Sequence, residues 1–532
     1  MTEKLYERFL PDIDFSVYDQ IVIGSGIGGL TAATWLAKAG KKVAIFERHY
    51  VPGGFTHSFK RKHGFQWDVG VHYVGNMGKK DSLIGMFDFL TNGKLEWESM
   101  GEVYDVVQIG DKKFEFKAGK ENFRNQFIQY FPQEEKAINA YIALIEKTNR
   151  RGTAFFFEKV FEPWLSKSVG WILRKRYNRY SQKSTWDVLS ELTTNKLLIA
   201  ALCGQCGNYG LSPKYSSFAA HAMVIAHFME GGYYPKGGAD QICLKTIEVL
   251  NSLGSKVFIN ADVQEIITIN NKVQGIKIDD TFIKCSNIIS NVGVNNTFNY
   301  LLSETDRIRC SFNLEKVQPA SGHICLYMGL NKSSSELNLP KHNLWYYAHE
   351  NTDELIENAK LAEAPSNFAY ISFPSAKDSE WDKKNPGTAT IQAITVGNYN
   401  WFSTYEDQPW RNRDDVYKKM KSDFEASMLK RLYSLFPQLE GNIQITEVST
   451  PLSTRHFSNY KNGEIYGLAH TPDRFKLPFL RPKTQIKGLK LVGQDITLVG
   501  VSGAMLSGIL CATTILKIKS WKLFKQISRQ KN

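Results

Sequence analysis

Short β-branched runs alternate with segments of small residues near the start of this chain. Residues 21–24 read IVIG and residues 43–46 read VAIF, a length and composition typical of strands buried in a parallel sheet. The intervening segment is rich in Gly and Ala and contains TAATWLAKAG, which has the length of a helix. The pattern predicts a βαβ unit over residues 21–46.

Three later segments show related patterns. Residues 231–278 predict a turn, a helix and a β-meander, and NIISNVG (287–293) predicts a returning strand. Residues 488–516 predict a short strand followed by a helix. No charged residue occurs between Ile496 and Leu516, so hydropathy alone would suggest a membrane span. Small residues instead favour a helix that is closely packed inside the protein: Gly500, Ser502, Gly503, Ser507 and Gly508.

A glycine motif joins the first predicted strand to its helix. In Gly24-x-Gly26-x-x-Gly29, the first glycine allows the tight turn and the second lets the backbone approach a pyrophosphate. The third lets the helix pack close to the strand. Glu47 ends the second strand, 18 residues after Gly29, where a carboxylate can accept ribose hydroxyls. Together these features predict binding of the adenosine half of a dinucleotide.

The sequence after Glu47 favours FAD over NAD. It continues RHYVPGGFTHSFKRKHGFQWDVGVHY rather than entering a crossover helix directly. Gly53 and Gly54 let the backbone pass close to a second cofactor segment, and Gly64 with Asp68-x-Gly70 predicts a hairpin that returns to the same site. An NAD-binding Rossmann domain followed by an unrelated loop is the alternative.

These stretches resemble the flavoprotein superfamily of amine oxidases, phytoene desaturases and escort proteins. The resemblance implies extended FAD, with Val263 at the adenine, Asp495 at the ribityl chain and the N-terminus of the last helix at the flavin pyrimidine. A positive helix end would stabilise the anion of reduced flavin. The residues predicted to contact FAD are Gly24, Ser25, Gly26, Ile27, Gly28, Gly29, Glu47, Arg48, Gly53, Gly54, Phe55, Thr56, Asp68, Gly70, Val71, His72, Val263, Gly493, Asp495, Val501, Ser502 and Ala504.

The predicted fold class is α/β. A Rossmann-like FAD-binding domain of the amine oxidase and phytoene desaturase type is interleaved with an α+β substrate domain. The FAD-binding domain is predicted from residues 1–80, 228–300 and 470–516, and the substrate domain from residues 81–227 and 301–469, with a basic tail at 517–532. Because only one GxGxxG motif occurs, electrons are expected from an external donor.

Further motifs narrow the resemblance to the retinol saturase family and the related carotenoid isomerases. They are DVGVHYVG (68–75), FPQEEKAINAYI (131–142), HAMVIAHFMEGGYYPKGG (221–238), FPSAKDSEW (373–381), FPQLEG (436–441) and IYGLAH (465–470). The resemblance covers nearly the whole chain. It implies chemistry on a carbon–carbon double bond of a hydrophobic polyene, and the expected outcome is saturation. Carotenoid isomerisation, desaturation and non-enzymatic binding of a prenyl lipid are the alternatives.

Two residues are candidate catalytic groups. His72 follows the DxG turn, and Tyr234 belongs to a YPxGG turn whose counterpart in the family lies near the flavin. Histidine suits proton transfer at neutral pH. The alternative is that His72 only orients the turn and that Tyr234 only forms part of the pocket wall. His221 and His227 lack the spacing of a metal site, and none is predicted.

Composition and charge add a surface prediction. Hydrophobic residues make up 42% and charged residues 22% of the chain, as in ordinary soluble proteins. Lys and Arg number 66 against 53 Asp and Glu, a net charge of +13, yet no nucleic-acid-binding module is visible. Residues 154–180 combine aromatic and apolar residues with a basic cluster, which predicts peripheral membrane contact. A core helix with a solvated end is the alternative.

The cysteine count and the N-terminus bear on location. Seven cysteines, including a CxxC at Cys203 and Cys206, form an odd set without a disulfide framework, which favours a reducing compartment. Residues 1–20 carry charges throughout and contain no apolar core typical of a secretory signal. The chain is therefore expected in the cytoplasm, peripherally attached to a membrane.

Overall fold

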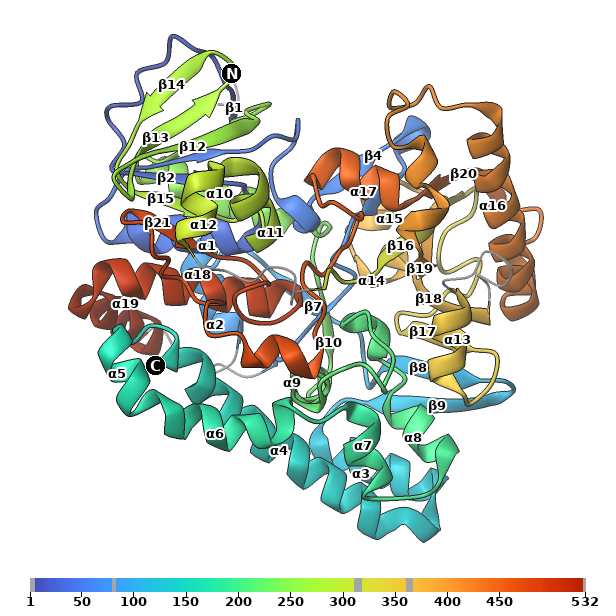
Figure 1. Cartoon of the computed structure of the whole chain (residues 1–532). Coiled ribbons are helices and arrows are strands. Elements are labelled where there is room, and N and C mark those ends of the chain that lie inside the picture. The colour runs from blue at the N-terminus through green and yellow to red at the C-terminus, as the bar shows by residue number, and fades with distance from the viewer. Residues whose placement is uncertain (1–4, 79–82, 311–317, 360–366, 530–532) are drawn as a thin grey trace.

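Two lobes face each other across the molecule (Figure 1). The computed structural model describes residues 5–78, 83–310, 318–359 and 367–529. Each lobe is built around its own β-sheet, and the chain passes between the lobes several times.

The first lobe contains a six-stranded sheet whose paired strands are all parallel. Its strands are short and buried, as the β-branched runs predict. In spatial order they are β1 (Glu7–Arg8), β11 (Lys256–Ile259), β3 (Val43–Phe46), β2 (Gln20–Ile23), β15 (Ile288–Ser290) and β21 (Leu489–Leu491).

Different structures cover the two faces of this sheet. One face packs on α1 (Ile27–Lys38), α2 (Leu83–Thr91), α10 (Asp240–Ser252), α18 (Gly500–Leu516) and α19 (Ile518–Arg529). The other face packs on the predicted meander, which forms β12 (Val263–Ile269), β13 (Lys272–Ile278) and β14 (Thr281–Lys284). The predicted α/β fold with a Rossmann-like arrangement is confirmed.

The second lobe contains a mixed seven-stranded sheet that sequence patterning did not predict. In spatial order its strands are β20 (Ile443–Ser449), β16 (Gly322–Leu330), β19 (Ala389–Gly397), β18 (Phe368–Ser372), β17 (Asn343–Tyr347), β8 (Val103–Ile109) and β9 (Lys112–Lys117). One face packs on α16 (Asp415–Leu435) and α13 (Thr352–Ala359) borders the sheet.

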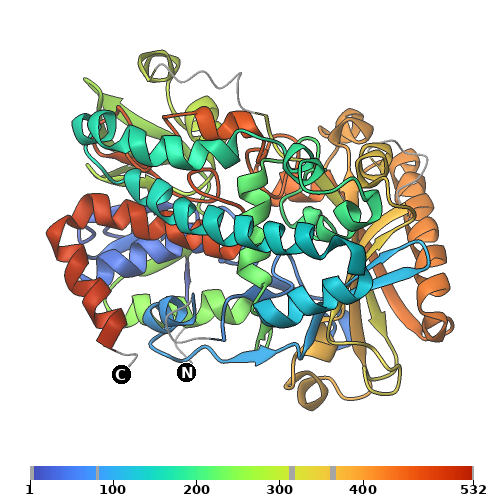
Figure 2. The same ribbon diagram turned by 90° about the horizontal axis from the view of Figure 1, so that it is seen from below.

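A layer of helices runs below both lobes and covers the other face of the seven-stranded sheet (Figure 2). Most of this layer is local in sequence, between residues 120 and 228. It comprises α3 (Lys120–Tyr130), α4 (Glu135–Glu158), α5 (Pro163–Ser168), α6 (Gly170–Ser181), α7 (Thr185–Ser190), α8 (Lys196–Leu202) and α9 (Phe218–Phe228).

Shorter elements connect the lobes. The predicted hairpin forms β4 (Ser58–Lys60) and β5 (Gln66–Asp68), and β10 (Gly232–Pro235) pairs with β6 (Val74–Gly75) and β7 (Trp97–Ser99). The remaining helices are α11 (Val294–Asn296), α12 (Glu304–Arg309), α14 (Pro374–Lys377), α15 (Trp381–Lys384) and α17 (Pro451–Ser458).

The strands of the two sheets come from alternating stretches of the chain. All strands of the parallel sheet and the meander fall within residues 1–80, 228–300 and 470–516. All strands of the seven-stranded sheet fall within 81–227 and 301–469. Helix α18 packs against α1. In the described chain, no helix combines the length and apolar character needed to cross a bilayer.

Two surface predictions need correction. Within residues 154–180, Phe155 and Phe156 belong to the core and are not available for membrane contact. The predicted tail is largely the helix α19, in which Phe524 packs against the ring of Trp35. Residues 530–532 of that tail lie outside the described residues.

Candidate cofactor and substrate site

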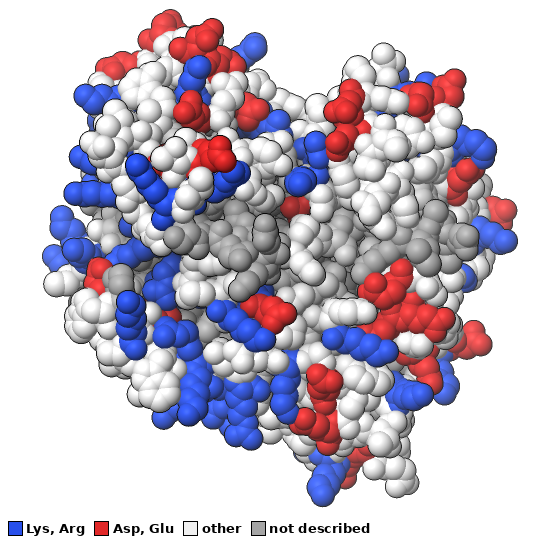
Figure 3. Space-filling view, in the orientation of Figure 1, with Lys and Arg blue, Asp and Glu red and all other residues white. Residues whose placement is uncertain are grey.

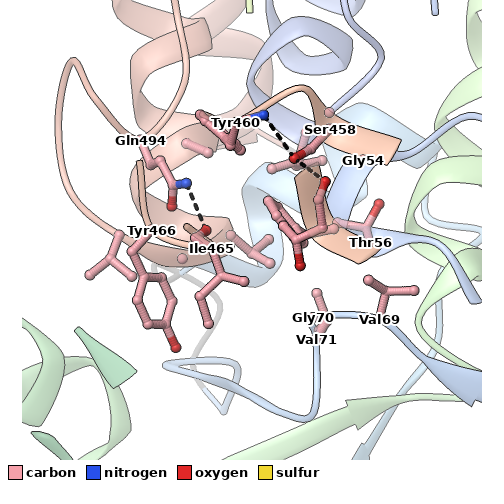
Figure 4. Close-up of a pocket in the computed structure, with 18 of the residues that line it drawn as sticks. Gly54, Thr56, Val69, Gly70, Val71, Ser458, Tyr460, Ile465, Tyr466 and Gln494 are labelled. Atoms are coloured by element: carbon pink, nitrogen blue, oxygen red, sulfur yellow. Dashed lines mark hydrogen bonds between the residues drawn. The ribbon is translucent and has the colours of Figure 1, made fainter. Parts of the chain in front are cut away.

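A cavity of about 610 Å³ lies where the lobes meet. Segments far apart in sequence form its wall: the first glycine turn, residues 54–56, residues 69–74, residues 457–466 and the start of α18. Figure 4 shows residues from several of these segments around the pocket, with Tyr466 and Gln494 on one side and Gly54, Thr56 and Gly70 on the other. The cavity thus joins the glycine turns, the stretches 69–74 and 465–466 and the start of α18.

Two helices begin at the wall of this cavity. Helix α1 starts after Gly26 and α18 after Val499, and neither has a side-chain cap or an acidic residue in its first turn. Their first residues line the cavity. The free N–H groups and positive dipole ends of both helices therefore face one space, which suits an anionic diphosphate.

The backbone at these helix starts is packed too closely to admit side chains. A Cβ added to Gly28 would lie 2.8 Å from Asn291 Oδ1 and 3.1 Å from both Ala504 O and Gly493 N. Asn291 in turn donates from Nδ2 to the carbonyl oxygens of Gly24 and Gly26. The glycines therefore keep a backbone cradle open that fits a dinucleotide phosphate group.

Glu47 lies at the end of β3 with its carboxylate fixed. Its Oε2 accepts from Ser25 N at 2.9 Å and Ser25 Oγ at 2.7 Å, and its Oε1 accepts from His49 N at 2.9 Å. Ser25 Oγ also accepts from Gly53 N at 2.9 Å. Ser25 therefore links the first glycine turn to the second turn at Gly53. It also orients the carboxylate of Glu47, which lines the cavity.

Most residues predicted to contact the cofactor share this one cavity. Those that line it are Gly24, Gly26, Ile27, Gly28, Glu47, Arg48, Gly54, Phe55, Thr56, Gly70, Val71, His72, Val263, Gly493, Val501, Ser502 and Ala504. Five others are not among the described lining residues and lie just behind the wall: Ser25, Gly29, Gly53, Asp68 and Asp495.

The structure corrects the predictions for Asp68 and Tyr234. Tyr234 is buried, is not among the described residues lining the cavity, and donates its hydroxyl to Asp68 Oδ2. Asp68 Oδ1 accepts from Ser58 Oγ and Ala239 N. Burial raises the pKa of Asp68 to about 6. Asp68 therefore ties β5 to β4, β10 and α10 instead of contacting a ligand.

Asp495 also has a structural role. Its Oδ2 accepts from Val294 N and its Oδ1 from Leu468 N, each at 2.8 Å, and the side chain is buried. Asp495 therefore braces three chain segments behind the cavity wall, and the ribityl contact implied for it stays a prediction. The preceding residue, Gln494, lines the cavity and donates to Ile465 O at 2.9 Å (Figure 4).

The part of the cavity lined by α9, β17 and β18 has a different character. We call it the aromatic half, and we call the part around α1 and Glu47 the dinucleotide half. In the aromatic half, no described lining residue between 206–228 or 345–396 is Asp, Glu, Lys or Arg. Its rings come from α9, β17, β18 and neighbouring loops: Tyr73, Phe228, Trp345, Phe368, Tyr370 and Tyr466. Such a wall suits an elongated apolar ligand.

His72 lies in the aromatic half beside Tyr370, with 5.4 Å between ring centroids. Burial, followed by the charges of Lys377 and His323, lowers its pKa to about 3, although a hydrogen bond with Gln392 acts in the opposite direction. At neutral pH the ring is therefore uncharged. His72 is thus a poor proton donor in this structure, although it remains a cavity group.

His221 and both cysteines of the CxxC pair are buried, and His227 and Cys206 line the cavity. His221 contacts the hydroxyls of Tyr141 and Tyr209, and His227 Nε2 accepts from Gly75 N. Cys206 is buried, which raises the pKa of its thiol to about 12, so it stays protonated. In the described chain, no group of three or more His, Cys, Asp or Glu residues is arranged to hold a metal ion.

Comparison with known proteins shows the family. Residues 22–90 match the model of the NAD(P)-binding Rossmann-like domain. The all-trans-retinol 13,14-reductase of Danio rerio is 32% identical over 97% of this chain and 89% of its own length. The chain belongs to the all-trans-retinol 13,14-reductase family. It is therefore an oxidoreductase, and the predicted enzyme class is confirmed.

Two other proteins place this family among its relatives. The chloroplastic prolycopene isomerase of Daucus carota is 26% identical over 93% of this chain and 79% of its own length. The solved structure of cyclohexylamine oxidase from Brevibacterium oxydans has a TM-score of 0.59 at 12% identity and covers 96% of this chain and 100% of its own. That likeness shows the shared fold, as predicted.

Several cavity residues were missed from the sequence. Asn291 directly follows β15 within the predicted segment 287–293, so its place at the carboxyl end of a parallel strand was a usable signal. Trp345, Tyr370 and His323 carried no such signal, because their strands belong to the unpredicted sheet.

Proposed function

We propose that the dinucleotide half holds FAD in an extended form. Two uncapped helix starts, the Asn291 cradle and Glu47 support this assignment. Glu47 would bind the ribose, the first turns of α1 and α18 would bind the pyrophosphate and flavin, and Val263 would lie at the adenine. The bound flavin would supply or remove a hydride. The extended course past Gly54 and Gly70 favours FAD over a nicotinamide cofactor.

We infer that the substrate is a hydrophobic polyene, one double bond of which is reduced. The observation that carries this proposal is the direct continuation of the dinucleotide half into an uncharged aromatic half. The name of the Danio rerio relative supports retinol-like polyenes. In this arrangement the chain holds the polyene, excludes water and positions the reacting bond.

An external electron donor completes the proposal. A single GxGxxG motif occurs in the chain, and its helix start faces the proposed FAD site. Reducing equivalents are therefore expected from a separate protein or small molecule.

Product mass tests the proposed reaction. Protein loaded with FAD is reduced without oxygen and offered retinol, carotenoid and fatty-acid panels. We expect a product two hydrogens heavier than a polyene substrate. A product of unchanged mass with altered geometry would instead establish isomerisation, which the prolycopene isomerase relative makes the second candidate. A colourless protein that takes no FAD would refute both and favour the lipid-binding alternative.

We also propose peripheral contact with an anionic membrane. Exposed apolar residues occur in α5, α6 and the start of α19, which lie at one end of the molecule (Figures 1 and 2). Lys and Arg gather around them on the lower left of Figure 3. This basic aromatic surface comprises Trp164, Val169, Trp171, Ile172, Ile518 and Trp521, with Lys167, Lys175, Arg176, Lys519, Lys522 and Lys525. Its composition is typical of an interfacial site.

Vesicle binding tests this surface. Trp164→Ser, Trp171→Ser and Trp521→Ser combined should weaken binding to phosphatidylserine-containing vesicles by about tenfold or more, because apolar anchors are lost. Ile269→Ser with Phe282→Ser removes exposed apolar residues from the meander and should leave binding unchanged. Equal binding by both variants would contradict the assignment.

A further inference from the structure

A buried polar cluster adjoins the aromatic half. Asp105 of β8 is fully buried, and its Oδ2 accepts hydrogen bonds from Tyr73 Oη at 2.8 Å and from Gln205 Nε2. Its Oδ1 accepts from Asn343 Nδ2 at 2.8 Å. Three donors from different elements therefore converge on one carboxyl group.

Lys377 lies at the other end of this cluster. Its Nζ donates to Asn343 Oδ1, to Ser372 Oγ at 2.8 Å and to His72 O at 3.0 Å. Asn343 thus connects Lys377 to Asp105 through its amide, and this fixes which end of the amide faces each group. The cluster also holds the backbone of His72 at the cavity wall.

Burial shifts the pKa values of both Asp105 and Lys377. It raises the pKa of Asp105 to about 6, although the bonds from Gln205, Asn343 and Tyr73 lower it. It lowers the pKa of Lys377 to about 7. The other titratable groups facing the cluster are Tyr73, Tyr104 and Tyr370 around Asp105, and His72, Asp68, Tyr234 and His342 around Lys377.

Tyr73 connects the cluster to the cavity. Its ring lines the aromatic half and stacks on Phe228 at 4.1 Å between centroids. Its hydroxyl donates to Asp105 and accepts from Asn208 Nδ2 at 2.9 Å, and Asn208 also lines the cavity. When Asp105 is protonated, it can donate to Tyr73 Oη, and the phenolic hydrogen is then free to turn toward a ligand.

We propose that Tyr73 is the proton donor in double-bond reduction and that Asp105 replenishes its proton. This inference rests on the proposed function. Reduction adds a hydride, with two electrons from the reduced flavin, to one alkene carbon. The other carbon forms its new C–H bond with the Tyr73 hydroxyl proton as the O–H bond breaks. The Asp105 proton moves to Tyr73 Oη in the same step, so the net product of the cluster is ionised Asp105.

The geometry favours Tyr73 over the two residues predicted from sequence. Tyr234 aims its hydroxyl at Asp68, outside the cavity wall. His72 faces the cavity, but as a neutral ring it would have to become an imidazolate to give up its proton. Tyr73 is backed by a carboxyl group that can return the proton at once.

An infrared titration of the purified protein tests the cluster without catalysis. In D2O the carbonyl band of a protonated carboxyl should titrate near pH 6 and disappear in Asp105→Asn. Tyr73→Phe should raise its midpoint, because a hydrogen bond that favours the ionised form is lost. Asp68→Asn and Glu464→Gln identify the separate bands of two other buried carboxyls whose pKa values are also raised, to about 6 and about 7. An Asp105 band that is already absent above pH 4.5 would overturn the inference.

Single-turnover kinetics test the proton transfer itself. Tyr73→Phe should slow polyene reduction about 100-fold or more and Asp105→Asn about tenfold, with FAD content and polyene binding nearly unchanged. Both should change the pH profile of the reduction step. Tyr347→Phe is the matched control: Tyr347 lies on β17 beside β8, its buried hydroxyl donates to Gly204 O, and it is not among the described lining residues.

The outcomes separate the two proposals. Wild-type protein that reduces no polyene would refute the proposed function. Wild-type protein that reduces a polyene while Tyr73→Phe does so equally fast would refute only the proton-donor assignment.

Discussion

The two halves of the cavity are built in different ways. The dinucleotide half is formed mainly by backbone, from glycine turns and two helix starts, together with the Glu47 carboxylate at the end of β3. The aromatic half is formed by side chains that project from β17, β18, α9 and loops of the second lobe. A site built from backbone is sensitive to substitution at the few positions where a side chain would block it. In a wall built from side chains, the contacts with a ligand are shared among many rings, so each ring contributes less. The halves should therefore respond differently to substitution.

The largest expected effect is loss of cofactor on substitution in the dinucleotide half. Gly28→Ala places a Cβ against Asn291 Oδ1 and the backbone of Gly493 and Ala504, so the helix starts must separate. We expect bound flavin, measured by absorbance per protein, to fall at least about tenfold. In Gly40→Ala, the new Cβ meets no atom within 4 Å. That control should lower thermal stability, because alanine is strained at the positive φ of residue 40, while flavin content stays at the wild-type level. Equal flavin content in both variants would contradict the proposal that Gly28 keeps the cofactor site open.

A smaller and selective effect is expected in the aromatic half. Tyr466→Ala removes a ring that lines the cavity and should weaken polyene binding about tenfold, equivalent to about 1.4 kcal/mol. Flavin content should stay at the wild-type level, as measured together with the polyene Kd by fluorescence quenching. Tyr215→Ala, at an exposed residue outside the described lining, should change neither quantity. If Tyr466→Ala lost flavin as well, the two halves would not be separable.

The smallest expected effect concerns pH, because both halves bury a histidine of strongly lowered pKa. The pKa values of His49 in the dinucleotide half and of His221 behind the aromatic half are lowered to about 3, chiefly by burial. A lowered histidine pKa contributes stability that is present above the unfolded value of about 6.5 and is lost as pH falls toward 3. His221→Gln should therefore reduce the pH dependence of the unfolding free energy by up to about 1.4 kcal/mol per pH unit in that window.

Urea unfolding of protein without added FAD, at pH values between 4 and 7, measures this slope. His349→Gln, at an exposed histidine, is the control and should keep the wild-type slope. A wild-type slope in His221→Gln would show that His221 is protonated in the folded protein.

The same difference explains what the sequence predicts well. Gly26 and Glu47 are identified because turn, strand end and helix start follow one another in a local pattern, and the structure brings them to one cavity. Asp495 and Tyr234 were assigned ligand roles from their positions in the family motifs. The direction of each side chain depends instead on partners elsewhere in the chain, here Val294, Leu468 and Asp68. Local pattern fixes the backbone position of such a residue but not the group its side chain meets.

The second lobe shows the other limit. Strand β16 is buried along its whole length and lacks the alternation that marks a half-exposed strand. Its neighbours β19 and β20 lie some 60 and 115 residues later in the chain, so their pairing has no local signal. Asp105 and Lys377 lie on different elements of this lobe, and their link through Asn343 exists only once β8 and β17 have paired.

Strand β21 and helix α18 close the dinucleotide half, yet they are synthesised long after the first glycine turn. One side of the cavity around α1 and this turn therefore stays open until residue 516 has been synthesised. The proposed flavin is expected to bind only after that point, and chains whose translation stops earlier should be flavin-free however well their first lobe folds.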